Sequence, residues 1–92
     1  MANIYTQIQR KLTQRLYLYD EYFTKALSDE DFDISDAFQV VRRSFRRFPY
    51  TDDESHTRYS FDGYTKDGRM LRVVLFLTRG KIKFKTAYEI FE

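Results

Sequence analysis

Cysteine is absent from this sequence of 92 residues, and His56 is its only histidine. The chain therefore has no disulfide, no thiol nucleophile and no ligand set for structural zinc or an iron–sulfur cluster. Its three glycines, Gly63, Gly68 and Gly80, are scattered, so they form no glycine-rich loop around a nucleotide phosphate. We expect a protein without a metal or another cofactor, in which packing alone holds the fold together.

Long apolar runs are also absent. No stretch approaches the roughly 20 consecutive apolar residues of a membrane-spanning helix, and residues 1–15 alternate apolar and polar side chains, unlike a signal peptide. A chain of this length builds one two-layer core rather than two independent cores. We therefore expect a single soluble domain over residues 1–92, located in the cytoplasm and without a membrane partner.

The charged residues are distributed unevenly along the chain. Residues 1–41 contain four Lys or Arg against seven Asp or Glu, whereas residues 42–92 contain twelve against seven, which gives about −3 and +5. This polarity favours attraction between the second part and RNA or another polyanion, although it does not define a fold or a reaction.

Apolar residues in the first half recur at every third or fourth position, which is the spacing of amphipathic helices. Between residues 3 and 27 they form one stripe, uninterrupted by proline or glycine. This stripe predicts a single long helix over residues 3–27, with a break near Asp20 as an open alternative.

A second amphipathic stripe, from Ile34 to Phe48, predicts another helix with Ser35 as its N-cap and Pro49 as its end. The last turns of this helix carry four arginines: Arg42, Arg43, Arg46 and Arg47. Arginines near a helix C-terminus complement the helix dipole and can simply remain in water. Their density keeps a second interpretation open, in which they bind phosphates beside the sheet.

The last third of the chain, from residue 56 to residue 92, predicts three antiparallel strands. Arg79-Gly80 is typical of a two-residue hairpin loop, and Lys66-Asp67-Gly68 suits a three-residue loop that ends in a left-handed glycine. The resulting register pairs Leu75 with Phe84 and gathers the apolar side chains, Tyr88 included, on one face. The predicted fold class is therefore α+β, with two N-terminal helices packed on one face of a three-stranded antiparallel β-meander.

The opposite face of this sheet is basic, with an apolar strip along its middle strand. Lys81, Lys83 and Lys85 point the same way because side chains alternate along a strand, and such a column of like charges invites an anion. Tyr64 and Phe76 on the same face are candidates for stacking on RNA bases. Together with the four arginines of the second helix, Tyr64, Phe76 and Lys81 form the expected RNA-binding set.

The same face carries groups that are suited to phosphoryl transfer. Arg58, Arg72, Lys83 and Lys85 would neutralise charge that develops on a phosphate, and His56 would transfer a proton. Basic side chains are enough to cleave RNA, because its 2′-hydroxyl is an internal nucleophile that DNA lacks. A lone surface histidine is most often inert, so both interpretations of His56 stay open.

Two segments resemble a known family of bacterial toxins. The hairpin GYTKDGRMLRVV at residues 63–74 and the closing strand KIKFKTAY at residues 81–88 are similar to those of BrnT-like toxins, which with their MqsR-like relatives belong to the RelE-like superfamily. The resemblance implies an endoribonuclease, either ribosome-dependent or free, that an antitoxin holds inactive. It also implies that the catalytic residues are Arg58, Arg72, Lys83, Lys85 and His56.

The sequence thus leads to two hypotheses about function. The first is a toxin-like endoribonuclease that cleaves RNA without a metal on the basic sheet face, with an acidic antitoxin as its partner. The second is a noncatalytic small module, such as a phage inhibitor or an antitoxin-type partner, that binds nucleic acid or an acidic target protein. Fold-level analogy cannot decide between them, because function depends on the site rather than on the fold.

Overall fold

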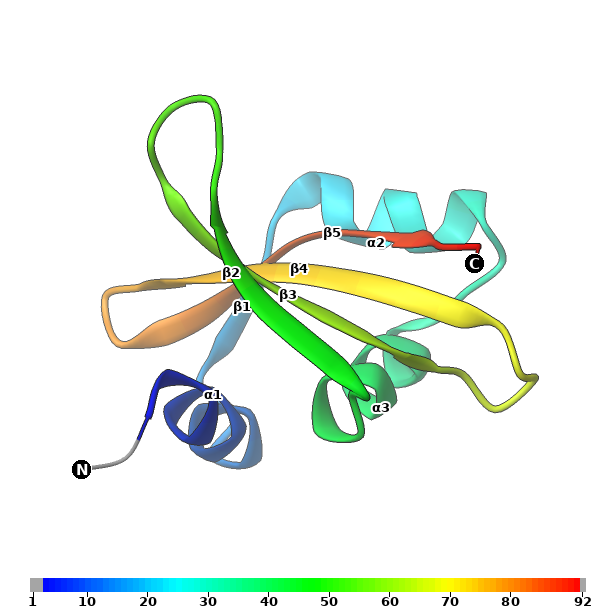
Figure 1. Ribbon diagram of the computed structural model, residues 1–92, viewed down its shortest axis with the longest axis horizontal. Helices are drawn as coiled ribbons and strands as arrows, with labels where there is room; N and C mark the ends of the chain where they lie inside the picture. The colour runs from blue at the N-terminus through cyan, green and yellow to red at the C-terminus, as the bar shows by residue number, and fades with distance from the viewer. Residues whose placement is uncertain (1–2, 92) are drawn as a thin grey trace.

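Residues 3–91 are described by the computed structural model, and they form three helices and five strands. The elements in chain order are α1 (Ile4–Thr13), β1 (Tyr17–Tyr19), α2 (Glu21–Asp29), α3 (Ile34–Arg42), β2 (Arg46–Thr51), β3 (Thr57–Tyr64), β4 (Met70–Thr78) and β5 (Lys81–Glu89). The strands form one sheet in the order β1-β5-β4-β3-β2, in which β1 is parallel to β5 and the other pairs are antiparallel (Figure 1). The α+β class is correct, but the prediction of two helices on a three-stranded antiparallel meander is wrong.

The long helix expected over residues 3–27 is two helices separated by a short strand. After α1, the backbone of Arg15 adopts a φ of +61°, which ends the helix and redirects the chain. The chain then extends as β1 along the start of β5. Asp20 begins α2, because its carboxylate accepts a hydrogen bond from the backbone N–H of Tyr22. The break near Asp20 is thus confirmed, and the apolar spacing runs across it because both helices bury residues in the same core.

The N-cap of α3 lies two residues earlier than predicted. Its N-cap is Asp33 rather than Ser35, and Asp33 forms a capping box with Asp36 in which each carboxylate accepts the other's backbone N–H at 3.0 Å. The hydrogen bond from the Ser35 hydroxyl, followed by that from the Asp36 backbone, lowers the pKa of Asp33. The capping box outcompetes Ser35, because it satisfies two orphan backbone donors at once.

The predicted C-terminal part of this helix is instead an edge strand. The helix ends at Arg42, and the chain from Arg46 onward pairs with β3 as β2. Pro49 therefore lies inside an edge strand, a position that tolerates proline because one side of the strand has no ladder to complete. The helical spacing of the apolar residues up to Phe48 misleads, because Phe48 pairs with Ser60 of β3 instead of continuing the apolar stripe of α3.

Both predicted hairpin loops are confirmed. Gly68 and Gly80 have φ angles of +85° and +78°, which glycine adopts at no steric cost. The register that these loops impose pairs Tyr59 with Leu75 on one side and Leu75 with Phe84 on the other. Local turn chemistry was sufficient to align β3 with β4 from Tyr59 to Tyr64, and β4 with β5 between the hairpin loop and the pair of Leu75 with Phe84.

A β-bulge changes the register of the second half of β5. Leu75 pairs with Phe84, but Val74 pairs with Thr86, so Lys85 is an extra residue without a partner on β4. The inside and outside positions beyond it are therefore exchanged. Tyr88, predicted on the apolar face, is 40% exposed on the other face, and Ala87, predicted on the basic face, is 2% exposed in the core. The bulge coincides with the end of β1, where the backbone N–H of Asp20 donates to the carbonyl of Phe84.

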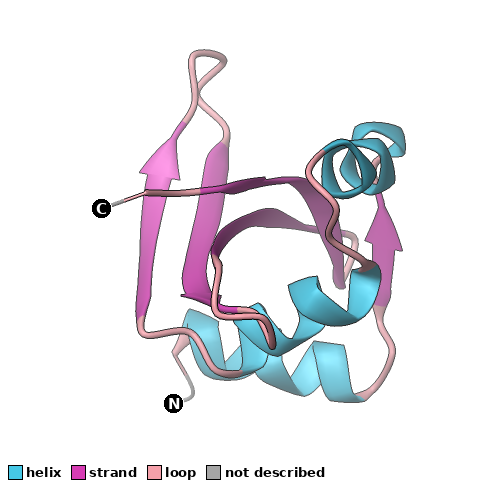
Figure 2. Ribbon diagram, turned by 90° about the vertical axis from the view of Figure 1, so that its right-hand side faces the viewer, coloured by secondary structure: helices cyan, strands magenta, loops and turns pink. Residues whose placement is uncertain are grey.

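The three helices and one face of the sheet enclose a single core. Figure 2 shows the sheet curving around α1 and α3, whereas α2 lies apart from them and packs along β5. The close approach of α3 explains Gly63, since a Cβ there would lie 3.3 Å from the backbone of Val40. None of the helices between residues 3 and 91 is long and apolar enough to cross a membrane.

Candidate functional site

The sheet face that turns away from the helices, called the outer face below, presents three cross-strand rows of side chains. In the order β2 to β5, the first row is Arg46, Asp62, Arg72 and Tyr88, the second is Phe48, Ser60, Val74 and Thr86, and the third is Tyr50, Arg58, Phe76 and Lys83. Ser60, Asp62 and Val74 are at most 2% exposed, although the helices pack on the opposite face. Side chains of the edge strand β2, which runs in front of β4 in the view of Figure 1, reach over this face: the ring centroid of Phe48 lies 5.1 Å from the Arg72 guanidinium carbon.

One end of the outer face is a cluster of ion pairs around Asp62, which is 0% exposed. Its carboxylate accepts hydrogen bonds from Nε of Arg46 at 2.7 Å and from Nε and Nη2 of Arg72 at 2.7 and 2.9 Å. Burial by itself raises the pKa of Asp62, but the bonds from Arg72 and Arg46 outweigh burial and hold that pKa below its usual value. The bond to Asp62 also raises the pKa of Arg72, whose Nη1 donates to the Tyr88 hydroxyl at 3.4 Å. Both arginines are therefore held by a carboxylate.

The other end of the outer face is organised around Arg58, which is 8% exposed. Its guanidinium lies over the Phe76 ring, 4.2 Å from the ring centroid, and its Nε donates to the Asp52 carboxylate at 3.1 Å. Asp52 also accepts the backbone N–H groups of His56 and Glu54, both at 2.9 Å. The bond from the His56 backbone is the largest cause of the lowered pKa of Asp52. Arg58 is thus a fixed and largely covered cation.

The imidazole of His56 lies beside this ion pair, just before β3. Its side chain is 56% exposed, and its Nδ1 is 3.7 Å from Oδ2 of Asp52, 3.9 Å from Oε2 of Glu54 and 3.5 Å from Nη2 of Arg58. The preceding residue, Ser55, has a φ of +63° and turns the chain into β3. An exposed imidazole between a carboxylate and a guanidinium is positioned to exchange a proton with a ligand.

A shallow depression in two parts crosses this end of the outer face. We call it the Phe76 groove, because Phe76 and Thr78 line both parts. The first part, of about 570 Å³, is also lined by Leu18, Arg79, Lys81 and Lys83, and the second, of about 500 Å³, by Ser55, His56, Thr57, Arg58 and Leu77. Within residues 3–91, Arg79, Lys81 and Lys83 form no ion pair. Their charges are available to an anion.

The structure brings only part of the expected catalytic set together. Arg58 and Lys83 share a row, and His56 borders the same groove. Arg72 lies two rows away and is held by the buried carboxylate. Lys85 is the extra residue of the bulge, so the expected unbroken column of lysines on β5 is interrupted.

The four arginines expected on one helix are dispersed. Arg42 ends α3 and Arg43 caps it, whereas Arg46 and Arg47 belong to β2. Arg46 binds the buried carboxylate of the outer face, while the guanidinium of Arg47 lies 5.1 Å from the ring centroid of Tyr5 in α1. The prediction that one helix carries all four arginines is wrong, because the chain leaves the helix after Arg42, and phosphate binding by these residues stays a prediction.

Several aromatic residues of the outer face were missed by the sequence patterns. Phe48 fits the apolar stripe of a helix, and Tyr50 falls after the predicted helix end. The bulge moves Tyr88 from the predicted apolar face to the outer face. Of the predicted aromatics, Phe76 lies in the groove, whereas Tyr64 is 55% exposed at the end of β3 and packs against Phe45 with ring centroids 5.1 Å apart. The missed rings could not be found from local spacing, because their position depends on strand pairing.

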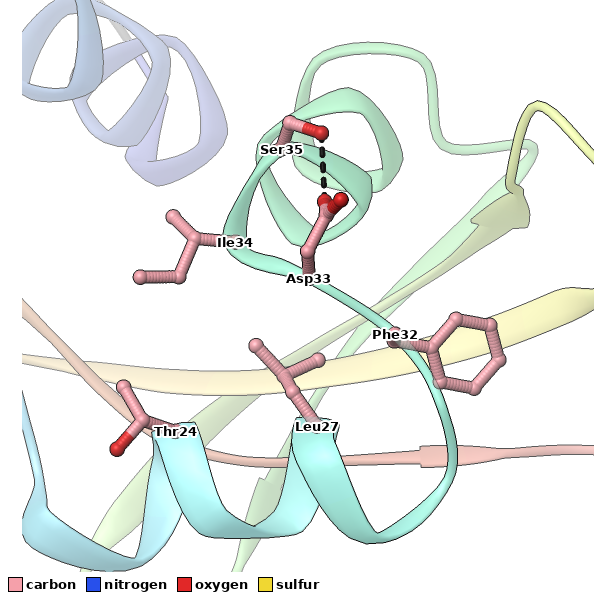
Figure 3. Close-up of a pocket in the computed structure, with 6 residues that line it drawn as sticks. All are labelled: Thr24, Leu27, Phe32, Asp33, Ile34 and Ser35. Carbon is pink, nitrogen blue, oxygen red and sulfur yellow. Dashed lines mark hydrogen bonds between the residues drawn. The ribbon is translucent and has the colours of Figure 1, made fainter.

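A third hollow, of about 480 Å³, lies between α2 and α3 on the helix side (Figure 3). It is lined by Thr24, Leu27, Phe32, Asp33, Ile34 and Ser35. The Asp33 carboxylate accepts a hydrogen bond from the Ser35 hydroxyl at 2.6 Å and caps α3. Since capping already uses the polar groups, this hollow offers no chemistry of its own.

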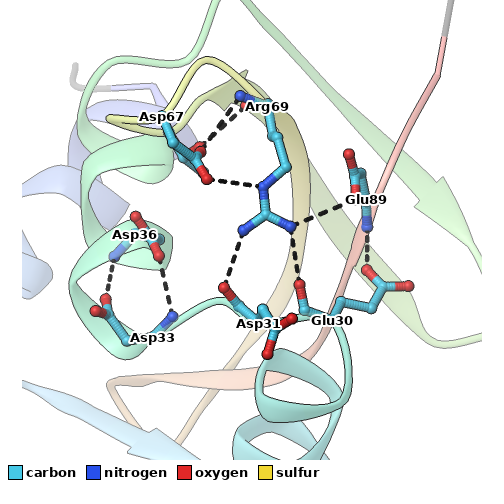
Figure 4. A network of polar contacts seen from close by, with 8 residues as sticks. Glu30, Asp31, Asp33, Asp36, Asp67, Arg69 and Glu89 are labelled. Carbon is cyan, nitrogen blue, oxygen red and sulfur yellow. Dashed lines mark hydrogen bonds and ion pairs between the residues drawn. The ribbon is translucent and has the colours of Figure 1, made fainter.

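Arg69 is the centre of a further polar network that fastens the α2–α3 connection to β4 (Figure 4). Its Nε donates to Asp67 at 2.9 Å, and its Nη1 and Nη2 donate to the backbone carbonyls of Glu30 and Asp31 at 3.0 and 2.9 Å. The guanidinium also lies 3.9 Å from the ring centroid of Phe32. Because these contacts engage every nitrogen of the guanidinium, the network is structural.

Comparison of this chain with protein-family models, with curated proteins and with solved structures finds no match. The resemblance to RelE-like toxins therefore stays a prediction. Among residues 3–91, no three side chains of Asp, Glu or His are grouped so that they could hold a metal ion. What the outer face offers is a groove with unpaired cations, an aromatic floor and one exposed imidazole.

Proposed function

We propose that the protein is a small nucleic-acid-binding module that holds its ligand across the Phe76 groove. The observation that supports this most strongly is the contrast between the cations of the outer face. Carboxylates hold Arg58 and Arg72, whereas Arg79, Lys81 and Lys83 border the groove without an ion pair in the described part of the chain. Unpaired cations release counterions when they meet phosphates, which is the main source of nucleic-acid affinity.

The aromatic floor of the groove favours a nucleic acid over other polyanions. Phe76 lies between the unpaired lysines of β5 and the guanidinium of Arg58, which covers part of its ring. Alternation of cations and aromatic rings suits a chain that itself alternates phosphates and bases. An acidic protein would use the lysines equally well but would gain little from the rings.

The endoribonuclease predicted from the sequence is a second candidate, which one observation favours. Nδ1 of His56 lies 3.7 Å from the Asp52 carboxylate and borders the groove in which the ligand would lie. A histidine oriented by a carboxylate is a common general base. Binding is preferred because Arg58 and Arg72 would have to leave their carboxylates, one of them fully buried, to stabilise a transition state.

The binding proposal is tested with Lys81→Ala/Lys83→Ala and a fluorescently labelled RNA, by anisotropy titration at several salt concentrations. We expect affinity to fall about tenfold and the slope of log K against log salt to become shallower by about 1 to 2, because two phosphate contacts are lost. The matched control is Lys25→Ala/Lys66→Ala, which removes the same charge from exposed sites outside the groove. Equal losses in the two variants, or no binding by the natural chain, would contradict the proposal.

Cleavage is checked in the same samples by denaturing gel electrophoresis of the RNA. Intact RNA after prolonged incubation with saturating protein agrees with a binding module. Cutting that disappears in His56→Ala, with unchanged thermal unfolding, would instead identify the endoribonuclease.

A further inference from the structure

The two ends of the outer face differ in what their cations can still bind. At the Phe76 groove, Arg79, Lys81 and Lys83 have no ion-pair partner among residues 3–91. At the opposite end, Arg72 donates through Nε and Nη2 to Asp62 and through Nη1 to the Tyr88 hydroxyl. Each nitrogen of that guanidinium already has an acceptor, so this end is poorly equipped for a phosphate.

What the outer face offers beside these cations is aromatic surface at both ends. Tyr50 and Tyr88 are 37% and 40% exposed, and the ring centroids of Phe48 and Tyr50 are 6.5 Å apart. Tyr50 lies in the row of Lys83 and Tyr88 in the row of Arg72, so one exposed tyrosine stands at each end of the face. Rings of this size, rimmed by fixed guanidinium groups and left in contact with water, are surfaces on which a planar ligand gains contact area.

The two ends are close enough for one ligand to reach both. Successive rows are two residues apart along a strand, so the row of Lys83 and the row of Tyr88 are separated by about 13 Å. A sheet face of this extent accommodates about two or three stacked bases. A strand laid across the rows would set phosphates against the unpaired lysines and bases against Tyr50 and Tyr88.

We infer that the outer face selects single-stranded over double-stranded nucleic acid, with Tyr50 and Tyr88 as its base-stacking platform. This inference rests on the proposed function and adds the class of ligand to it. A duplex buries the faces of its bases in its own stack, so it can engage the lysines but not the tyrosines. A single strand engages both ends.

The experiment compares one labelled RNA as a single strand and after annealing to its complement, by anisotropy at one salt concentration. We expect the natural chain to bind the single strand about tenfold more tightly than the duplex. Tyr50→Leu/Tyr88→Leu should weaken single-strand binding about tenfold and leave duplex binding unchanged, whereas Lys81→Ala/Lys83→Ala should weaken both.

Two further variants separate stacking from folding. Tyr50→Phe/Tyr88→Phe keeps both rings and removes only the hydroxyls, so it should retain the preference for a single strand. Tyr22→Leu removes a tyrosine that is 67% exposed on α2, outside the outer face, and should change neither affinity. Thermal unfolding identifies any variant that has lost its fold, and if the leucine pair has lost it, Tyr50→Leu and Tyr88→Leu are each measured alone.

The possible failures are distinguishable. Equal affinity for single strand and duplex, sensitive to the lysines, would overturn the inference and leave the proposed function intact. Equal weakening of both ligands by the leucine pair would also overturn it, because stacking would not be the reason. Binding of neither ligand would overturn both, and an acidic protein would then be the partner to seek.

Discussion

At the scale of single residues, Asp62 determines which charges of the outer face remain unused. A carboxylate that is 0% exposed is costly unless its charge is paired and its oxygens are hydrogen-bonded, and Arg46 and Arg72 provide both. Part of this pair was readable from the sequence, since the predicted register already places Asp62 beside Arg72 in one row. The contact of Asp62 with Arg46 was not readable from the sequence, because Arg46 reaches that row only through the pairing of β2 with β3.

Replacement of this carboxylate should be among the most destabilising changes on the outer face. Asp62→Asn leaves two guanidinium groups without a counter-charge, and we expect the free energy of unfolding to fall by about 2 to 3 kcal/mol, discounted for their partial exposure. Urea unfolding measures this loss. Asp53→Asn, in the exposed loop between β2 and β3, is the control and should have almost no effect.

The sign of the pH dependence follows from the lowered pKa of Asp62. A carboxyl whose pKa is depressed by folding contributes stability above its unfolded value of about 3.9, and this contribution disappears as pH falls through the folded pKa. The difference between the natural chain and Asp62→Asn should therefore be constant near neutral pH and shrink below about pH 4. A difference that persists undiminished in strong acid would rule out ionic pairing as its source.

At the scale of secondary-structure elements, features set by local turn residues were predicted correctly, whereas features set by pairing with distant segments were not. Gly68 and Gly80 indicate the two hairpins in the sequence, because the turns themselves require the positive φ angles that these glycines adopt. The bulge at Lys85 has no such signal, since it depends on where β1 and α2 meet β5. The same difference applies to the candidate site. The groove around Phe76 was predictable from the hairpins, whereas the tyrosine platform depended on the bulge and on β2.

The connection between α2 and α3 depends on one side chain from the turn that precedes β4. Arg69→Ala removes the donors to the carbonyls of Glu30 and Asp31 and the stack on Phe32, so we expect a loss of about 2 kcal/mol in unfolding free energy. Hydrogen exchange should accelerate first at the Phe32 amide. Arg69→Lys should recover little of the loss, because an ammonium cannot reproduce the fork of the guanidinium.

Arg10→Ala serves as the comparison for this variant. Arg10 is an exposed arginine of α1, and its removal should shift the urea midpoint only slightly. If Arg69→Ala were no more destabilising than Arg10→Ala, the network in Figure 4 would not anchor the helices.

At the scale of the whole molecule, the charge asymmetry of the sequence becomes a spatial one. The acidic first part, residues 1–41, supplies the short edge strand β1 and nearly all of the helical layer, and the basic second part supplies the other four strands. A polyanion approaching the molecule is thus drawn toward the sheet and away from the helices. This orientation followed from composition once the topology was known, although composition alone could not say which cations are already paired.

An open sheet with a wettable face also has two borders at which another chain could add a strand. One border is β1, which is only three residues long and gives way to α2 along the remainder of β5. The other is β2, where Pro49 lacks the backbone N–H that would donate a hydrogen bond to a carbonyl of an added strand. Both borders thus resist growth by strand addition, so the molecule can present the outer face to a ligand without self-association into ribbons.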